Sequence, residues 1–368
     1  MLGLKLQAYT MRSGLRTAVT LLVALAAAQL CVWLHTPIPW MLGPLLVTAL
    51  ASVLGAPTRS APLLRNAGQW VIGVVLGLYF TPQVGALVVS LWWAIALAVL
   101  WALLLGALFD AWLQHRHRAE LAHLPPSAWR ATTYFASAIG GASEMTLLAE
   151  RHGARTDLVA AAHSVRLVLV VLTLPFAMQW AQSHWGLQVD ARLLPGPVVA
   201  HWPGLFWLAL ATGAGALVMV AFKRTNPWFM GALLVSMGLT LSGVHWSAVP
   251  TELSNAAQLV IGVSLGVRFQ REFVHTAPRW LATAASGSVV MMLLSLGFGL
   301  FLAHTTGLHP ATLILGTAPG GIAEMAITAK VLQLGVPVVT AFQVCRLVAV
   351  LILVGPIFQW SHRRKKTA

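Results

Sequence analysis

The sequence has little charge and few groups of the kinds that usually carry chemistry. Of its 368 residues 9% are charged, nine are acidic, two are cysteine and three are tyrosine. A soluble domain has about a quarter of its residues charged, so this composition excludes an ordinary soluble globular protein. The two cysteines, Cys31 and Cys345, both lie in apolar segments. They say nothing about a disulfide framework or a redox compartment.

The chain also lacks the short motifs by which many enzymes hold metals or nucleotides. It has no HExxH, no CxxC pair, no Walker loop and no dinucleotide glycine fingerprint in the required context. The 13 histidines are dispersed, and His115 and His117 lie beside arginines that would repel a cation. We therefore expect no enzyme, no cofactor and no metal site.

Long apolar runs fill most of the chain. Hydrophobic residues make up 58% of it, and the mean hydropathy is +0.79. Runs near 17–34, 84–109, 204–222 and 281–303 are each long enough to cross a hydrocarbon core of ~30 Å as a helix. We read the first run as an uncleaved span rather than a signal peptide, because 204–222 matches it in the second half. The sequence thus predicts an all-α polytopic membrane protein.

The net charge of +14 has a simpler explanation than nucleic-acid binding. The basic residues are scattered through short loops, with dense clusters only in "HRHR" at 115–118 and "HRRKK" at 362–366. Lysine and arginine gather on cytoplasmic loops, where anionic headgroups attract them. The longest hydrophilic stretch, about 110–130, is too short for a helix-turn-helix domain. We expect the lipid bilayer as a partner and no direct nucleic acid.

Four sequence blocks recur in the same order in the two halves of the chain. "PWMLGPLL" at 39–46 matches "PWFMGALL" at 227–234, and "QWVIGVVLGLYF" at 69–80 matches "QLVIGVSLGVRF" at 258–269. "GGASEM" then matches "GGIAEM", and "HSVRLVLV" at 163–170 matches "QVCRLVAV" at 343–350. The repetition predicts two membrane repeats, 1–180 and 204–360, a periplasmic linker at 181–203 and a basic cytoplasmic tail at 361–368.

Loop charges predict that the two repeats are inserted upside down relative to each other. "LHTPIP" after the first segment has no lysine or arginine, whereas its counterpart carries Lys223 and Arg224. The next three pairs of loops show the same exchange, which requires an odd number of crossings per repeat. We expect ten spans and two re-entrant broken helices, with both termini cytoplasmic. Twelve full spans are the second choice.

The two Gly-Gly motifs hold the charged residues that lie deepest in apolar sequence. Glu144 and Glu324 are the only acidic residues within apolar segments, and Arg166 and Arg346 follow them by 22 positions. A charge at membrane depth is costly and persists where it is paired or faces a polar cavity. We expect Gly140–Gly141 and Gly320–Gly321 to break a helix and to place the positive N-terminal end of a half-helix near the membrane middle.

Two interpretations of these groups remain open. In one, the glutamates cap the half-helices and the arginines neutralise them as ion pairs. In the other, the glutamates exchange protons and the arginines bind a carboxylate or phosphate. The second predicts a proton-coupled carrier of a small anion.

Other recurring residues have structural explanations. Pro39–Trp40 and Pro227–Trp228 fit the start of a helix at the membrane interface. Small residues four apart, at Gly73 and Gly77 and at Gly262 and Gly266, favour close helix packing. Gln69 and Gln258 recur within apolar segments, where an interhelical hydrogen bond and a substrate contact explain them equally well.

On these blocks the chain resembles the AbrB duplication family of bacterial inner-membrane proteins over nearly its whole length. Names attached to that family suggest a regulator of gene expression or an ammonia monooxygenase, and neither follows from the residues. A copper monooxygenase needs clustered histidines. We expect a secondary transporter of a small anionic or polar metabolite, or alternatively a membrane sensor that regulates expression indirectly. The oligomeric state is open, with a homodimer as one candidate.

Overall fold

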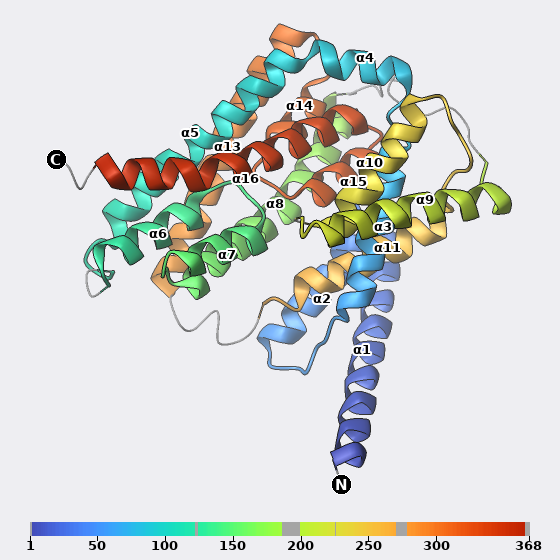
Figure 1. Cartoon of the computed structure of the whole chain (residues 1–368), viewed down its shortest axis with the longest axis horizontal. Helices are drawn as coiled ribbons and strands as arrows, with labels where there is room; N and C mark the ends of the chain where they lie inside the picture. The colour runs from blue at the N-terminus through green and yellow to red at the C-terminus, as the bar shows by residue number, and fades with distance from the viewer. Residues whose placement is uncertain (1, 122–123, 186–198, 225, 270–277, 365–368) are drawn as a thin grey trace. The chain divides into compact units, whose positions relative to one another are not determined.

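The computed structural model describes residues 2–121, 124–185, 199–224, 226–269 and 278–364. Within these ranges the chain forms helices and no strand. The helices are α1 (Leu2–Trp33), α2 (Pro39–Val53), α3 (Pro62–Gly77), α4 (Pro82–Ser90), α5 (Trp92–His117), α6 (Pro126–Ser137), α7 (Ala142–Arg151), α8 (Thr156–Trp185), α9 (Trp202–Ala221), α10 (Pro227–Leu241), α11 (Thr251–Gly266), α13 (Pro278–Thr306), α14 (Pro310–Thr317), α15 (Ile322–Val331) and α16 (Val336–Arg364) (Figure 1).

The helices belong to two compact units, and each unit contains parts of both sequence repeats. Unit 1 contains α1 to α3 and α9 to α11, and unit 2 contains α5 to α7, α13 to α16 and most of α8. The boundary between the units crosses α4 after Ala86. The compact units therefore do not coincide with the repeats 1–180 and 204–360, because in unit 1 α2 and α3 of the first repeat pack against α11 and α10 of the second.

Six helices in the described ranges are long and apolar enough to cross a membrane. They are Gly14–Trp33, Trp92–His117, Thr156–His184, Trp202–Ala221, Pro278–Thr306 and Val336–Trp360. The pair α3 and α4, which meet at a bend of 89°, is a seventh candidate. The chain is thus a multi-pass membrane protein. The apolar helices α2 and α10 have 15 residues each, which is about 22 Å of helix, so length alone does not count them as spans.

The apolar run at 84–109 does not form one helix. Helix α4 ends at Ser90, Leu91 departs from helical backbone angles, and α5 begins at Trp92. The hydroxyl of Ser90 donates to the carbonyl oxygen of Leu87 at 2.7 Å. Serine competes in this way with the helical backbone, which a count of apolar residues cannot detect.

Unit 1 is built on close helix crossings at the recurring glycines. Helix α3 packs on α10, and α11 packs on α2. A Cβ at Gly73 would lie 2.5 Å from the carbonyl oxygen of Phe229, and one at Gly262 would lie 2.5 Å from that of Met41. No side chain fits at these distances, so the backbones touch as the glycine spacing predicts.

The starts of α2 and α10 also match. Pro39 and Pro227 occupy the first turn of their helices, as predicted, and the preceding residues Ile38 and Asn226 both have left-handed backbones, with φ of 42° and 46°. Isoleucine rarely adopts this conformation. Because both equivalent positions adopt it, the left-handed residue before the helix is a shared feature of the two repeats.

In unit 2 each repeat contributes a short helix that is broken and then turns back. Helix α6 stops at Ser137 and α7 starts at Ala142, and α14 stops at Thr317 before α15 starts at Ile322 (Figure 1, green and red-orange). The hydroxyl of Thr132 in α6 accepts a hydrogen bond from the N–H of Arg155, beyond the end of α7, at 3.0 Å. Once α7 has ended, the chain is therefore back beside the middle of α6, so α6 and α7 form a hairpin.

The second hairpin is fastened in the same way. The hydroxyl of Thr312 accepts a hydrogen bond from the N–H of Gly335 at 3.1 Å, 180 positions after the first pair. Apolar side chains from α5, α13 and α16 pack against Leu313 of α14 in this hairpin. At the other end of unit 2, α16 continues to Arg364, four residues into the segment expected to be the tail. Residues 365–368, and 186–198 of the expected linker, lie outside the described ranges.

Candidate functional site: the two helix breaks of unit 2

The predicted helix breaks occur at both Gly-Gly motifs. Ala138 and Ala318 leave helical geometry with extended backbones (ψ of 136° and 142°), and Gly141 and Gly321 cap the following half-helices. The capping glycines have φ of −66° and −82°. Since any residue can adopt these angles, backbone freedom is not the reason for glycine here.

The glycines that cap the half-helices instead leave room for the glutamate side chains. The carboxylate of Glu144 folds back over Gly141, where a Cβ would collide with Oε2, and Glu324 lies over Gly321 in the same way. The glutamate is the third residue of each half-helix and lies beside its N-terminus, where N–H groups lack helical partners. This placement agrees with the capping interpretation.

The first glycine of each motif makes room for a methionine. A Cβ at Gly140 would lie 2.7 Å from Met145 Cε, and one at Gly320 would lie 3.0 Å from Met325 Cγ. Both methionines are fully buried. The methionine that ends "GGASEM" and "GGIAEM" therefore packs against the break and fixes its shape.

Arg166 of α8 is buried and binds the carbonyl groups that the first break leaves without helical partners. Its guanidinium donates to the oxygen of Ala138 at 3.0 Å and, at 3.4 Å, to that of Ser137. It also donates to Nδ1 of His163 at 2.7 Å. The Nε2 atom of His163 lies 2.8 Å from the oxygen of Phe135. Together they supply donors for the C-terminal end of α6.

Arg346 of α16 does the same at the second break. It binds the carbonyl oxygens of Ala318, at 2.5 Å, and of Gly320, at 2.7 Å, and it donates to Oε1 of Gln343 at 2.6 Å. Gln343 in turn donates to the oxygen of Leu315 at 2.7 Å. Both arginines thus hold the main chain of a helix break, a role that neither sequence interpretation contained.

The four charged groups belong to one unit but are not equally buried. Glu324, Arg166 and Arg346 are 6%, 4% and 5% exposed, whereas Glu144 is half-buried. Arg166 lies close enough to Arg346 for their charges to repel each other. The two breaks therefore place like charges near each other in a buried region, where such charges are costly without a counter-ion.

Eight of the ten predicted site residues lie in unit 2, and the glutamines do not. Gln69 is half-buried on α3 and Gln258 is buried on α11, both in unit 1. In the part of the chain that the structure describes, no three histidine, cysteine, aspartate or glutamate residues gather as metal ligands would.

The sequence reasoning missed His163 and Gln343, although both open quoted blocks. Each precedes its arginine by three positions, so the two side chains share one face of a helix. A polar residue three positions before the arginine, within an apolar run, was the sequence signal that could have found them. The two breaks differ here, since one arginine is held by a titratable imidazole and the other by an amide.

Most of the chain matches one family model. A model described as "Transition state regulatory protein AbrB" covers residues 40–362. The chain belongs to the AbrB family. The match includes both helix breaks and both buried arginines, so the whole candidate site lies within the residues that the family model covers.

Two relatives of this AbrB family chain match over most of their own lengths. "Uncharacterized protein YhjN" of Bacillus subtilis (strain 168) is 25% identical over 354 residues, which cover 88% of each chain. "Putative regulator AbrB" of Escherichia coli (strain K12) is 25% identical over 333 residues, which cover 88% of this chain and 89% of the relative. One of the two relatives is thus named for regulation.

Proposed function

We propose that this AbrB family protein is a secondary transporter of a small anion in the bacterial inner membrane, and that unit 2 carries its binding site. The observation that supports this most is the pair of helix breaks, each with an arginine on its carbonyl groups and a glutamate at the N-terminus of the next half-helix. Many transporters place broken helices of this kind at their substrate sites.

The charges at the breaks suggest how proton and anion binding would be linked. Two guanidinium groups and two ionised carboxylates sum to zero, and protonation of both glutamates would leave a charge of +2. An anion would compensate that charge in a medium where an uncompensated charge is costly. Proton uptake and anion binding would then favour each other.

Arg346 has a donor to offer such an anion. Its Nε–H is buried and has no hydrogen-bond partner among the described residues, while the two terminal nitrogens hold the helix break. A buried N–H without a partner costs free energy. A carboxylate or phosphate oxygen would satisfy it, and the planar guanidinium suits both groups.

The proposal includes the mirror-image insertion of the repeats. In a hairpin, the half-helices α6 and α7 enter and leave on one side, so Arg151 stays on the same face as the start of α6. With α14 and α15 entering from the other face, the breaks would approach the membrane middle from opposite sides. Alternating exposure of a central site to the two compartments could then follow from symmetry.

Cysteine accessibility tests this insertion. In a chain with Cys31 and Cys345 replaced by alanine, we expect Arg151→Cys and Lys223→Cys to react with an impermeant maleimide only after the cells are opened. Thr305→Cys should react in intact cells. A topology of twelve full spans reverses all three results, so that outcome would exclude inverted repeats.

Flux measurements test the function itself. Proteoliposomes with an internal pH dye are given an inward proton gradient, and phosphate and a panel of mono- and dicarboxylates are added one at a time. We expect at least one anion to accelerate proton entry in the presence of the protein and not in empty vesicles.

The alternative is a membrane sensor that regulates expression indirectly, which the names of the family model and of the Escherichia coli relative favour. It predicts no flux of any tested anion or cation, together with a changed transcript profile in cells that lack the protein. Flux in vesicles would decide for transport, whereas a transcript change alone is compatible with both functions.

A further inference from the structure

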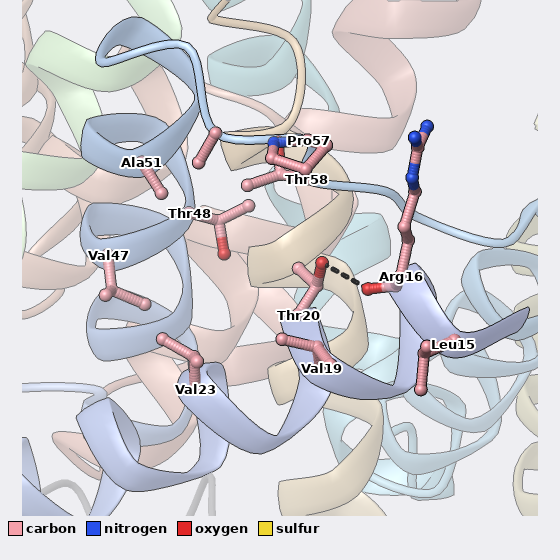
Figure 2. Close-up of a pocket in the computed structure, with 11 residues that line it drawn as sticks. Leu15, Arg16, Val19, Thr20, Val23, Val47, Thr48, Ala51, Pro57 and Thr58 are labelled. Carbon is pink, nitrogen blue, oxygen red and sulfur yellow. Dashed lines mark hydrogen bonds between the residues drawn. The ribbon is translucent and has the colours of Figure 1, made fainter. Parts of the chain in front are cut away.

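A groove of about 300 Å³ opens in unit 1 between α1, α2 and the loop that follows α2. Figure 2 shows α1 side chains on one wall and α2 side chains on the other, with Pro57 and Thr58 at one end. The lining residues are Leu15, Arg16, Val19, Thr20, Val23, Val47, Thr48, Ala51, Ala56, Pro57 and Thr58.

The groove lies on a surface that the bilayer covers. Gly14–Trp33 of α1 is one of the candidate spans, and only 17% of its most apolar window is buried within the protein. Val19 and Val23, which line the groove, are 49% and 46% exposed. Since a spanning helix exposes such residues to lipid, the natural neighbour of this groove is a lipid molecule.

The basic side chain of Arg16 lies at one end of a groove whose lining is otherwise mostly apolar (Figure 2). Arg16 extends along the end at which Pro57 and Thr58 lie, whereas Val23 and Val47 lie at the opposite end (Figure 2). The hydroxyl of Thr20 donates to the carbonyl oxygen of Arg16 at 2.8 Å and accepts from the N–H of Arg59 at 3.2 Å. An elongated molecule with an anionic head and an apolar tail matches this order of side chains.

Thr48 supplies a second, independent indication of a ligand. It is 2% exposed, it lines the groove, and its hydroxyl has no hydrogen-bond partner in the described part of the chain. A helical threonine usually donates to the carbonyl four residues earlier, as Thr20 does. A buried hydroxyl without a partner is costly and indicates that an acceptor belongs in the groove.

We propose that this groove binds one anionic phospholipid of the surrounding bilayer. One of its acyl chains lies along Val19, Val23 and Val47, and its phosphate faces the guanidinium of Arg16. Thr48 donates a hydrogen bond to an oxygen of the glycerol ester region, between the head and the tail. The site is separate from the helix breaks, so it does not depend on the transport proposal.

Native mass spectrometry of the full chain tests this site. The protein is purified from nanodiscs that contain equal amounts of phosphatidylglycerol and phosphatidylethanolamine with the same acyl chains, and the retained lipid is identified. We expect one phosphatidylglycerol to remain bound. Arg16→Gln should lower its retention about five-fold, as expected for one basic residue near an anionic surface.

Two variants on α2 separate the groove from the rest of the helix. Ala51→Trp fills the groove and should abolish retention, whereas Leu50→Trp, on an exposed neighbour outside the lining, should retain lipid as the wild type does. Thr48→Val should reduce lipid retention without changing the shape of the groove. If Ala51→Trp does not fold, the result for Thr48→Val tests whether the groove binds the lipid.

Three outcomes would overturn the proposal. One is equal retention of the two lipids, and another is unchanged retention in both Arg16→Gln and Thr48→Val. The third is that the wild-type groove holds a second copy of the chain instead of a lipid, and that Ala51→Trp displaces this copy.

Discussion

Arg346→Met lowers the free energy of unfolding by about 2–5 kcal/mol, because buried acceptors that lose their donors cost roughly 1–3 kcal/mol each. The substitution keeps an unbranched chain of similar length but leaves the carbonyl oxygens of Ala318 and Gly320 without the donors that hold them. Gln343 also loses the donor at its Oε1. Thermal unfolding of purified protein, followed by tryptophan fluorescence, should show a midpoint several degrees lower.

Matched variants distinguish a hydrogen-bonding role from a charge. Arg346→Lys keeps the charge but cannot reach two carbonyls with a planar fork, so its midpoint should lie between those of Arg346→Met and the wild type. Arg151→Met changes an exposed arginine at the end of α7 and should leave the midpoint unchanged. If Arg346→Met melts with the wild type, the carbonyls at the break find other donors and Arg346 is not a structural cap.

The sequence was sufficient to locate the two helix breaks because the signal there is local. Two glycines, a glutamate and a methionine recur at the same spacing, and the structure ends and restarts a helix at both copies. It also predicted the glycine crossings of unit 1 and the proline starts of α2 and α10. Each of these features depends on residues that are close in sequence or that repeat.

Features that depend on distant packing could not be read from the sequence. The arginines and the breaks they cap are separated by about 26–29 positions, and only the folded hairpin brings Ala138 to Arg166 or Gly320 to Arg346. The interleaving of the repeats likewise results from contacts between α3 and α10 and between α2 and α11. No periodicity within one segment encodes such contacts.

The expected number of spans shows the same limit. Hydropathy treats each apolar run as a span of full length, yet α2 and α10 have 15 residues each, and the run at 84–109 is divided at Leu91. Helix ends are set by prolines, by hydroxyl groups and by neighbouring helices. The accessibility experiment therefore has to decide how these shorter helices are inserted in the membrane.

Glu324→Gln and Glu144→Gln are each expected to lower proton-coupled anion uptake about a hundred-fold, the scale at which a positioned proton-transfer group acts. Glutamine has the same shape and still offers an oxygen to the N-terminus of the half-helix, so the break should remain folded. It cannot bind and release a proton. Uptake and proton entry in proteoliposomes, normalised to the amount of folded protein, measure the effect.

Glu150→Gln is the matched control, because Glu150 is an exposed residue of the same half-helix as Glu144. It should transport as the wild type does. Glu324 is buried whereas Glu144 is half-buried, so we expect the larger loss of coupling at Glu324, where water cannot replace the carboxylate as a proton acceptor. If both motif variants transport normally, the carboxylates serve only as helix caps and the proton-coupling proposal fails.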